Sequence, residues 1–273
     1  MELTFALIIG VCAGLHTSTW GMYKDAPYEG FSWPRYFRST FISATAAVVV
    51  VLVTKLDVTQ APNMVVLYGF TYVIERAIME YYKTFLREQD QSKYFIPMQF
   101  SVQGNVVKSR AARLSAAAAY LVGVVLTAYG IYYLQTTGFH PSGVVVVITV
   151  GSIGGWISAF GGAWKDAPKE GFEIPKFFRS PLIALTYAFM LASFTDNYLY
   201  ICFGALGYTI GTIETYKTFF FPRKPRGKFA GKEIQFPEMM QKRHYFVPLY
   251  VAIWVAVIGT ILVAFMQPHE GLI

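Results

Sequence analysis

Two seventeen-residue passages hold the charged side chains that are best placed to do chemistry. They read YKDAPYEGFSWPRYFRS (23–39) and WKDAPKEGFEIPKFFRS (164–180), with eleven identical positions at a constant offset of 141 residues. Each passage supplies a lysine and an arginine, and these groups donate charge-assisted hydrogen bonds to carboxylates and phosphates. The candidate ligands of an anion or a lipid headgroup are Lys24, Arg38, Lys165 and Arg179.

The same passages contain four carboxylates, which are Asp25, Glu29, Asp166 and Glu170. Carboxylate oxygens suit hard cations, and two of them could act as general acid and base. Neighbouring lysines and arginines would neutralise a metal site, however, and no nucleophile or histidine recurs at a matched spacing. We therefore expect no metal, no cofactor and no catalytic residue. The favoured interpretation is structural: the passage fixes two helix ends at a membrane interface.

A second motif, EYYKTF (80–85), recurs as ETYKTF (214–219). Its glutamates would end two helices at the depth of the arginines in the first motif. A charge at that depth is normally paired, so the sequence predicts Arg38–Glu80 and Arg179–Glu214 ion pairs. The lysine three residues after each glutamate is a further expected partner.

The two halves differ at Glu75 and Arg76, which correspond to the uncharged Thr209 and Ile210. Glu75 lies about 7.5 Å deeper in its helix than Glu80, at about 1.5 Å per residue. Arg76 can pair with Glu80 one turn later, which leaves Glu75 as a candidate proton- or cation-handling group. The alternative is a structural hydrogen bond to a neighbouring helix.

His16 begins a polar run with Thr17, Ser18 and Thr19 inside an expected membrane span. Such a run suits a polar cavity, although a lone histidine is often only a hydrogen-bonded packing residue. The candidate substrate- or ion-binding residues are therefore Glu75, Arg76, His16, Glu80 and Glu214.

Composition indicates the elements that must position these residues. Apolar residues make up 55% of the chain and charged residues 14%, against about 25% charged in soluble domains. Charges cluster between apolar runs near the ~20 residues that cross a bilayer, so we expect an all-α polytopic membrane protein with eight transmembrane helices. The expected spans are Leu3–Gly21, Thr40–Val53, Met64–Glu80, Leu114–Tyr133, Val144–Gly162, Leu182–Ser193, Tyr198–Glu214 and Phe246–Met266.

The duplication predicts two four-helix repeats, 1–139 and 140–273. An even number of spans in each repeat gives both the same orientation, so the repeats are parallel. A GxxxG pattern also recurs, as Gly10 and Gly14 in one repeat and Gly151 and Gly155 in the other. Small residues four apart let membrane helices approach closely.

Prolines and glycines predict the shape of the repeated passage. Pro27 and Pro168 are expected to break the preceding helix, and Gly30 and Gly171 to permit a turn. A proline at 34 or 175 suits the first turn of the next helix.

Lysine and arginine predict the orientation. The loops after the first, third, fifth and seventh spans hold 21 of 23 basic residues, so these loops are expected to be cytoplasmic and both termini to face outward. The location is then an inner membrane or its equivalent. The net charge of +7 indicates contact with anionic lipid headgroups rather than nucleic acid. The basic tract 221–232 could contact lipid or a partner.

Three functions remain open. The first is a transporter or channel for a small anionic or zwitterionic solute, with its pathway between the repeats. The second is a lipid-phosphate enzyme or flippase at the cytoplasmic interface. The third is a non-catalytic subunit of a larger membrane complex, and a homo-oligomer is also open. We favour the first.

Overall fold

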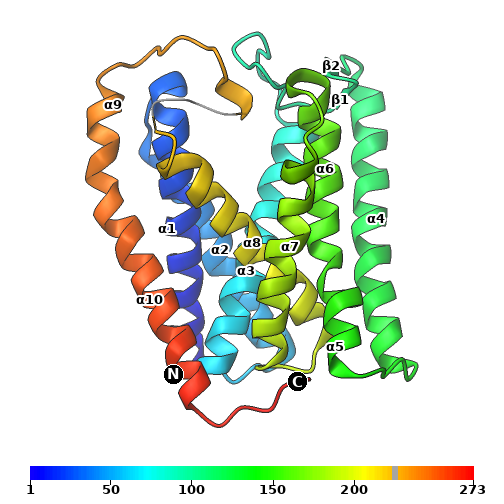
Figure 1. Ribbon diagram of the computed structural model, residues 1–273. Helices are drawn as coiled ribbons and strands as arrows, with labels where there is room; N and C mark the ends of the chain where they lie inside the picture. The colour runs from blue at the N-terminus through cyan, green and yellow to red at the C-terminus, as the bar shows by residue number, and fades with distance from the viewer. Residues whose placement is uncertain (223–226) are drawn as a thin grey trace.

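The computed structural model describes residues 1–222 and 227–273, and it is almost entirely helical (Figure 1). The long helices are α1 (Glu2–Glu29), α2 (Trp33–Thr54), α3 (Ala61–Tyr81), α4 (Arg110–Thr136), α6 (Ile153–Glu170), α7 (Ile174–Ala192), α8 (Tyr198–Phe219) and α10 (Val247–Met266). Shorter elements are the π-helical segments η1 (Tyr82–Leu86) and η2 (Val147–Gly151), the 3-10 helices η3 (Gly227–Phe229) and η4 (Arg243–Phe246), helices α5 (Gly143–Val146) and α9 (Met239–Lys242), and the antiparallel strands β1 (Ser101–Val102) and β2 (Asn105–Val106).

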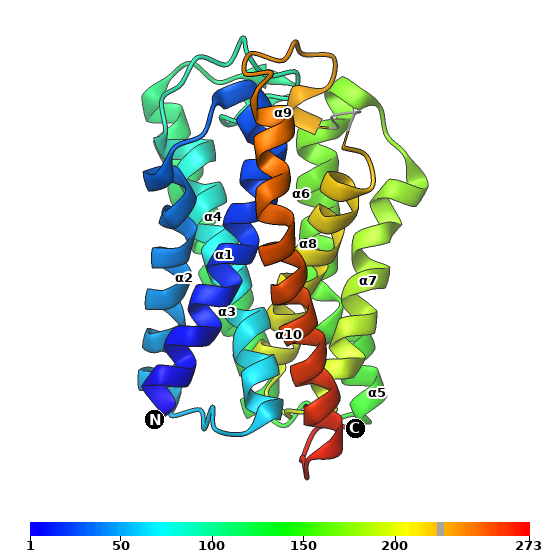
Figure 2. The same cartoon turned by 90° about the vertical axis from the view of Figure 1, so that its left-hand side faces the viewer.

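Five helical segments are long and apolar enough to cross a membrane, as expected of an integral membrane protein. They are α1, α2, α4, the continuous segment Gly143–Glu170 and the segment Met239–Met266. Helices α3, α7 and α8 run alongside them in the bundle (Figures 1 and 2). Each of the eight expected spans therefore coincides with a helix, although several helices extend further at their ends.

The prolines of the repeated passage do not break their helices, which corrects the sequence prediction. Pro27 lies inside α1 and Pro168 inside α6, each near the end of its helix. The helices end instead at Gly30 and Gly171, whose φ angles are 72° and 84°. A proline near a helix end removes only one hydrogen bond, whereas the left-handed region favours glycine.

The carbonyl that Pro27 leaves without a helical donor has another partner. A proline at position 27 cannot donate to the carbonyl of Tyr23, four residues earlier. Nη1 of Arg243 donates to that oxygen at 3.1 Å, and the Arg243 side chain is buried. The segment before α10 thus completes the hydrogen bonding of α1.

The recurring glycines lie at the contact between the first two helices of each half. A Cβ at Gly10 would lie 2.6 Å from the carbonyl oxygen of Ser43 on α2, and a Cβ at Gly151 would lie 2.6 Å from Cβ of Ala188 on α7. Gly14 and Gly155 are packed in the same way against α2 and α7. Glycine at these positions allows the close approach of α1 to α2 and of the α6 segment to α7.

Helices α3 and α8 form the central contact between the sequence halves. A Cβ at Gly207 would lie 1.9 Å from the carbonyl oxygen of Gly69, so the two backbones touch. Tyr68 and Tyr208 pack beside this contact with ring centroids 5.6 Å apart. The contact leaves no room for a side chain where the two glycines meet.

The fourth helix of each sequence half packs against the other half. On α10, Ile253 and Val257 belong to the same buried cluster as Val65 and Tyr72 of α3. On α4, Ile131 packs with α5, η2 and α8. Figure 1 shows α10 beside α1 of the first half, and α4 contacts α8 of the second half. The two halves therefore form one interlocked bundle.

Both termini lie at one end of the bundle, which we call the terminal end, and the opposite end is the loop end (Figures 1 and 2). Helices α1 and α6 both run from the terminal end to the loop end. The C-terminal segment is fixed at the terminal end by a hydrogen bond of 2.6 Å from the Leu272 amide to the Ala192 carbonyl.

Candidate functional site

A cavity of about 1550 Å³ lies at the loop end of the bundle. Its walls come from the loop-end halves of α1, α2, α3, α6, α7 and α8. Both copies of the seventeen-residue passage line it, and so do both glutamates of the second motif. The duplicated sequences thus build one shared space, which we call the central cavity.

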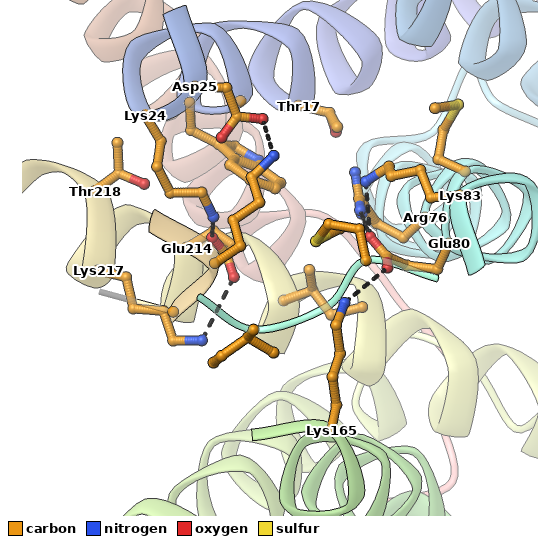
Figure 3. Close-up of a pocket in the computed structure, with 18 of the residues that line it drawn as sticks. Thr17, Lys24, Asp25, Arg76, Glu80, Lys83, Lys165, Glu214, Lys217 and Thr218 are labelled. Atoms are coloured by element: carbon orange, nitrogen blue, oxygen red, sulfur yellow. Dashed lines mark hydrogen bonds and ion pairs between the residues drawn. The ribbon is translucent and has the colours of Figure 1, made fainter. Parts of the chain in front are cut away.

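Two ion pairs join the sequence halves across the central cavity (Figure 3). Nζ of Lys24 on α1 lies 2.9 Å from Oε2 of Glu214 on α8. Nζ of Lys165 on α6 lies 3.9 Å from Oε2 of Glu80 on α3. The two lysines occupy equivalent repeat positions, and so do the two glutamates. Each half therefore contributes a lysine to the glutamate of the other half, and we call these contacts the cross pairs.

Glu80 has two further cationic partners on its own segment. Arg76, one helical turn earlier, bonds to its carboxylate, and Nζ of Lys83 lies 2.8 Å from Oε1. Lys83 lies beyond the end of α3 and is 16% exposed. Burial lowers the pKa of Lys83 to about 8, while attraction to Glu80 opposes that shift. Of the three cations that contact Glu80, Lys165 is the most distant.

Glu214 has fewer competing partners. Ile210 stands at the position that corresponds to Arg76, and Lys217 is 3.6 Å from the carboxylate. Lys24 is therefore the closest cation to Glu214. The shorter of the two cross pairs thus forms in the half that lacks the extra arginine.

The predicted Arg38–Glu80 and Arg179–Glu214 ion pairs do not form, because cations from α1, α3, η1, α6 and α8 already hold both glutamates. Both arginines line the central cavity. In the described part of the chain neither has an ion pair, and Nε of each is buried without a hydrogen-bond partner. The guanidinium of Arg38 lies 6.0 Å from the ring centroid of Tyr82.

The four carboxylates of the repeated passage also line the central cavity, and each contacts a lysine. Nζ of Lys228 lies 2.7 Å from Asp25 and 3.8 Å from Glu29. Nζ of Lys176 contacts both Asp166 and Glu170. Among the residues that the structure describes, no three histidine, cysteine or acidic side chains group as metal ligands.

The central cavity extends inward to Thr17 on α1 and past Arg76 to Val73 on α3; Figure 3 shows Thr17 and Arg76. Trp20 lies between cations at this inner end: its ring centroid is 4.8 Å from Nζ of Lys24 and 5.2 Å from the guanidinium of Arg76. Nε1 of Trp20 donates to the hydroxyl of Tyr72 at 2.9 Å. Aromatic rings and two cations thus bound the inner end.

His16 and Glu75 lie just beyond the inner end and are both fully buried. Nδ1 of His16 is 3.0 Å from the hydroxyl of Tyr72, and its ring stacks on Tyr250 with centroids 4.3 Å apart. A carboxylate oxygen of Glu75 lies 3.7 Å from Nη1 of Arg76. Neither oxygen of Glu75 has a hydrogen bond within the described residues.

Sequence reasoning missed two residues of the site that come from the segment before α10. Lys228 neutralises Asp25, and Arg243 donates to the Tyr23 carbonyl. Pro27 indicates that the carbonyl at position 23 has no helical donor. The residue that donates to this carbonyl, Arg243, is 220 residues away in the sequence. The tract 221–232 falls partly outside the described residues, at Arg223, Lys224 and Arg226.

Comparison with known proteins gives no relative. No protein-family model matches the chain, and no curated protein and no solved structure is significantly similar to it.

Proposed function

We propose that this protein is an integral membrane transporter or channel for a small anionic or zwitterionic solute. In this proposal eight helices cross the membrane as two parallel repeats, and the solute pathway runs between them. The loop end is cytoplasmic and the termini lie on the other side of an inner membrane or its equivalent. The observation that carries the proposal is the central cavity, which both copies of the repeated passage line.

The charge of the cavity supports an anionic or zwitterionic solute. Among the described residues, twelve basic and eight acidic side chains line it, an excess of four positive charges. A concave site with a net excess of one sign of charge concentrates solutes of the opposite sign. Paired carboxylates within the same site would also accommodate the ammonium group of a zwitterion.

The contacts between the inner end and the terminal end support a pathway that is closed on one side. Trp20, Tyr72 and His16 bound the inner end through direct hydrogen bonds. The backbones of Gly69 and Gly207 touch between α3 and α8. In a transporter, opening of the terminal end would require these contacts to separate while the loop end closes.

Transport by purified protein in liposomes tests the proposal. The radiolabelled probes are inorganic phosphate, succinate and glutamate, because together they cover anionic and zwitterionic solutes. We expect saturable uptake of at least one probe above protein-free liposomes. Ala77→Trp should abolish that uptake, since Ala77 lines the central cavity.

Val125→Trp is the matched control, because Val125 is 64% exposed on the outer face of α4. This variant should transport like the wild type. Absence of uptake for all three probes, or equal uptake by the wild type and Ala77→Trp, would contradict a pathway through the central cavity.

A further inference from the structure

The central cavity contains more cations than its carboxylates can neutralise. Seven of its eight acidic side chains contact a basic side chain, and the exception, Glu173, is exposed. Of the twelve basic side chains that line the cavity among the described residues, seven take part in such contacts. The five that do not are all arginines: Arg35, Arg38, Arg87, Arg179 and Arg243.

Three of these arginines already have hydrogen-bond acceptors. Arg35 donates to the Glu29 carbonyl at 3.3 Å, and Arg87 donates to the Tyr94 hydroxyl at 3.4 Å. Arg243 donates to two backbone carbonyls. Their guanidinium groups therefore have structural partners, which Arg38 and Arg179 lack in the described part of the chain.

Arg38 and Arg179 share two further properties. They occupy the same position in the two repeats, at the offset of 141 residues. Each has a buried Nε atom with no hydrogen-bond partner. A buried donor without an acceptor is costly. Arg113 and Arg243 also have such an Nε atom, but their terminal nitrogens donate hydrogen bonds, whereas in the described part of the chain those of Arg38 and Arg179 do not. The residues outside the described ranges include no acidic side chain that could pair with either one.

The charges near Arg38 increase its capacity for an anion. Arg35 and Arg87 line the same cavity as Arg38, and none of the three has an ion pair among the described residues, so this part of the cavity has an excess of positive charge. Lys24 and Lys165, in contrast, are held by the cross pairs. Among the described cations of the repeated passage that line the central cavity, the two arginines are thus the ones without an ion pair or a hydrogen-bond acceptor.

We propose that Arg38 and Arg179 form two equivalent oxyanion-binding subsites, one from each repeat, that face the same central cavity. Each guanidinium would hold a carboxylate or a phosphate group by paired hydrogen bonds. The inference rests on the proposed function in one respect, because it names the group of the transported solute that the protein recognises. The same chemistry would also bind the phosphate of a lipid headgroup.

Binding to purified protein in a neutral detergent tests the proposal. The probes are inorganic phosphate and succinate, and the measurement is the affinity from titration of thermal stability. Arg38→Gln and Arg179→Gln should each weaken binding of at least one probe tenfold or more. This is the loss of about 1.4 kcal/mol or more expected for a charge-assisted hydrogen bond. Arg110→Gln is the matched control, because Arg110 is exposed and does not line the central cavity, and the affinity of this variant should change less than threefold.

A second pair of variants keeps the test valid if the glutamine variants do not fold. Arg38→Lys and Arg179→Lys retain the charge but lose the paired geometry, so they should weaken binding by a smaller factor. Unchanged affinity in a folded Arg38→Gln/Arg179→Gln double variant would overturn the proposal.

A further experiment with lipids distinguishes a soluble anion from a lipid headgroup as the source of the oxyanion. Native mass spectrometry of protein from nanodiscs of phosphatidylcholine alone, or with phosphatidylglycerol, would report a retained anionic lipid. Lipid retention that the double variant loses, together with no binding of either soluble probe, would assign the subsites to headgroups. If lipid retention and the affinity for both soluble probes are the same in the double variant as in the wild type, the proposal fails.

The outcomes also separate this inference from the proposed function. If binding depends on the two arginines but liposomes show no uptake, the oxyanion subsites are supported and the proposed transport function is contradicted. If the double variant takes up solute like the wild type, the proposed transport function is supported and the oxyanion subsites are contradicted.

Discussion

At the scale of single residues, Arg243 replaces the hydrogen-bond donor that Pro27 removes from α1. We expect Arg243→Gln to lower the free energy of unfolding by about 1–3 kcal/mol, because it leaves a buried carbonyl at Tyr23 without a partner. In a Pro27→Ala background the new amide at position 27 can donate to that carbonyl. In that background Arg243→Gln should lower the free energy of unfolding by about 0.5–1.5 kcal/mol less than it does in the wild type. Denaturant unfolding of the four proteins measures the difference, and equal costs in both backgrounds would refute the pairing.

Lys83 provides a pH-dependent prediction. Its pKa of about 8 lies below the ordinary value of 10.5, so the folded protein releases this proton earlier than the unfolded chain. Between these two pH values the unfolded chain binds more protons, and this group's contribution to stability rises with pH. The rate at which an acylating reagent modifies Lys83, followed by mass spectrometry, should rise with a midpoint near pH 8.

Glu80→Gln is the control for this titration. The carboxylate of Glu80 opposes the lowering of the Lys83 pKa, so its removal should move the midpoint to a still lower pH. A wild-type midpoint near 10.5 would show that burial does not affect this amine.

The sequence could identify the charged residues of the site but not most of their partners. Both glutamates and the lysines three residues later were predicted to interact, and they do. The predicted partners Arg38 and Arg179 were wrong, because a similar depth in the membrane does not determine which cation reaches a carboxylate. Other cations hold both glutamates. Glu80 is held by neighbours on its own segment and by Lys165 of the other half.

At the scale of helices, the α3–α8 contact depends on the absence of a side chain at Gly207. A Cβ there would lie 1.9 Å from the Gly69 carbonyl oxygen. Gly207→Ala must therefore separate two backbones, and overpacking of this kind costs about 1–3 kcal/mol or more. Thermal unfolding in detergent should show a clear loss of stability.

Gly211, one turn later on α8, is the matched control. A Cβ at Gly211 would lie 3.6 Å from the Tyr72 ring, which is ordinary contact. Gly211→Ala should leave the melting temperature near that of the wild type or above it, since alanine favours a helix more than glycine does. Similar losses in both variants would contradict the role of the close contact.

Helix positions were largely predictable because each apolar run is long and bounded by charges. The starts of α2 and α7 were predictable too, since Pro34 and Pro175 lie in their first turns. The ends of α1 and α6 were not, because hydrophobicity gives no signal where a helix continues into polar surroundings, as these two do through Pro27 and Pro168. The exchange of α4 and α10 between the halves was also not predictable. It depends on which apolar face packs against which, and the sequence pattern alone leaves that open.

At the scale of the whole molecule, the duplication places two copies of one charged passage around a single space. The cross pairs link Lys24 to Glu214 and Lys165 to Glu80, so the halves are joined at the cavity itself. The pairs are unequal in length, 2.9 Å and 3.9 Å. Partly buried charges interact strongly. The two cross pairs would therefore oppose any movement that separates the two halves at the cavity.

The central claim is that the cavity is a water-filled space that opens at the loop end and is closed toward the terminal end. Access of a membrane-impermeant thiol reagent to Ala77→Cys and Ser158→Cys, which both line the cavity, tests it most directly. The background is a protein in which Cys12 and Cys202 are replaced by alanine. With the protein in sealed membranes of known orientation and no solute added, both positions should react from the loop side and remain protected from the terminal side. Protection from both sides, or reaction from the terminal side alone, would contradict the account.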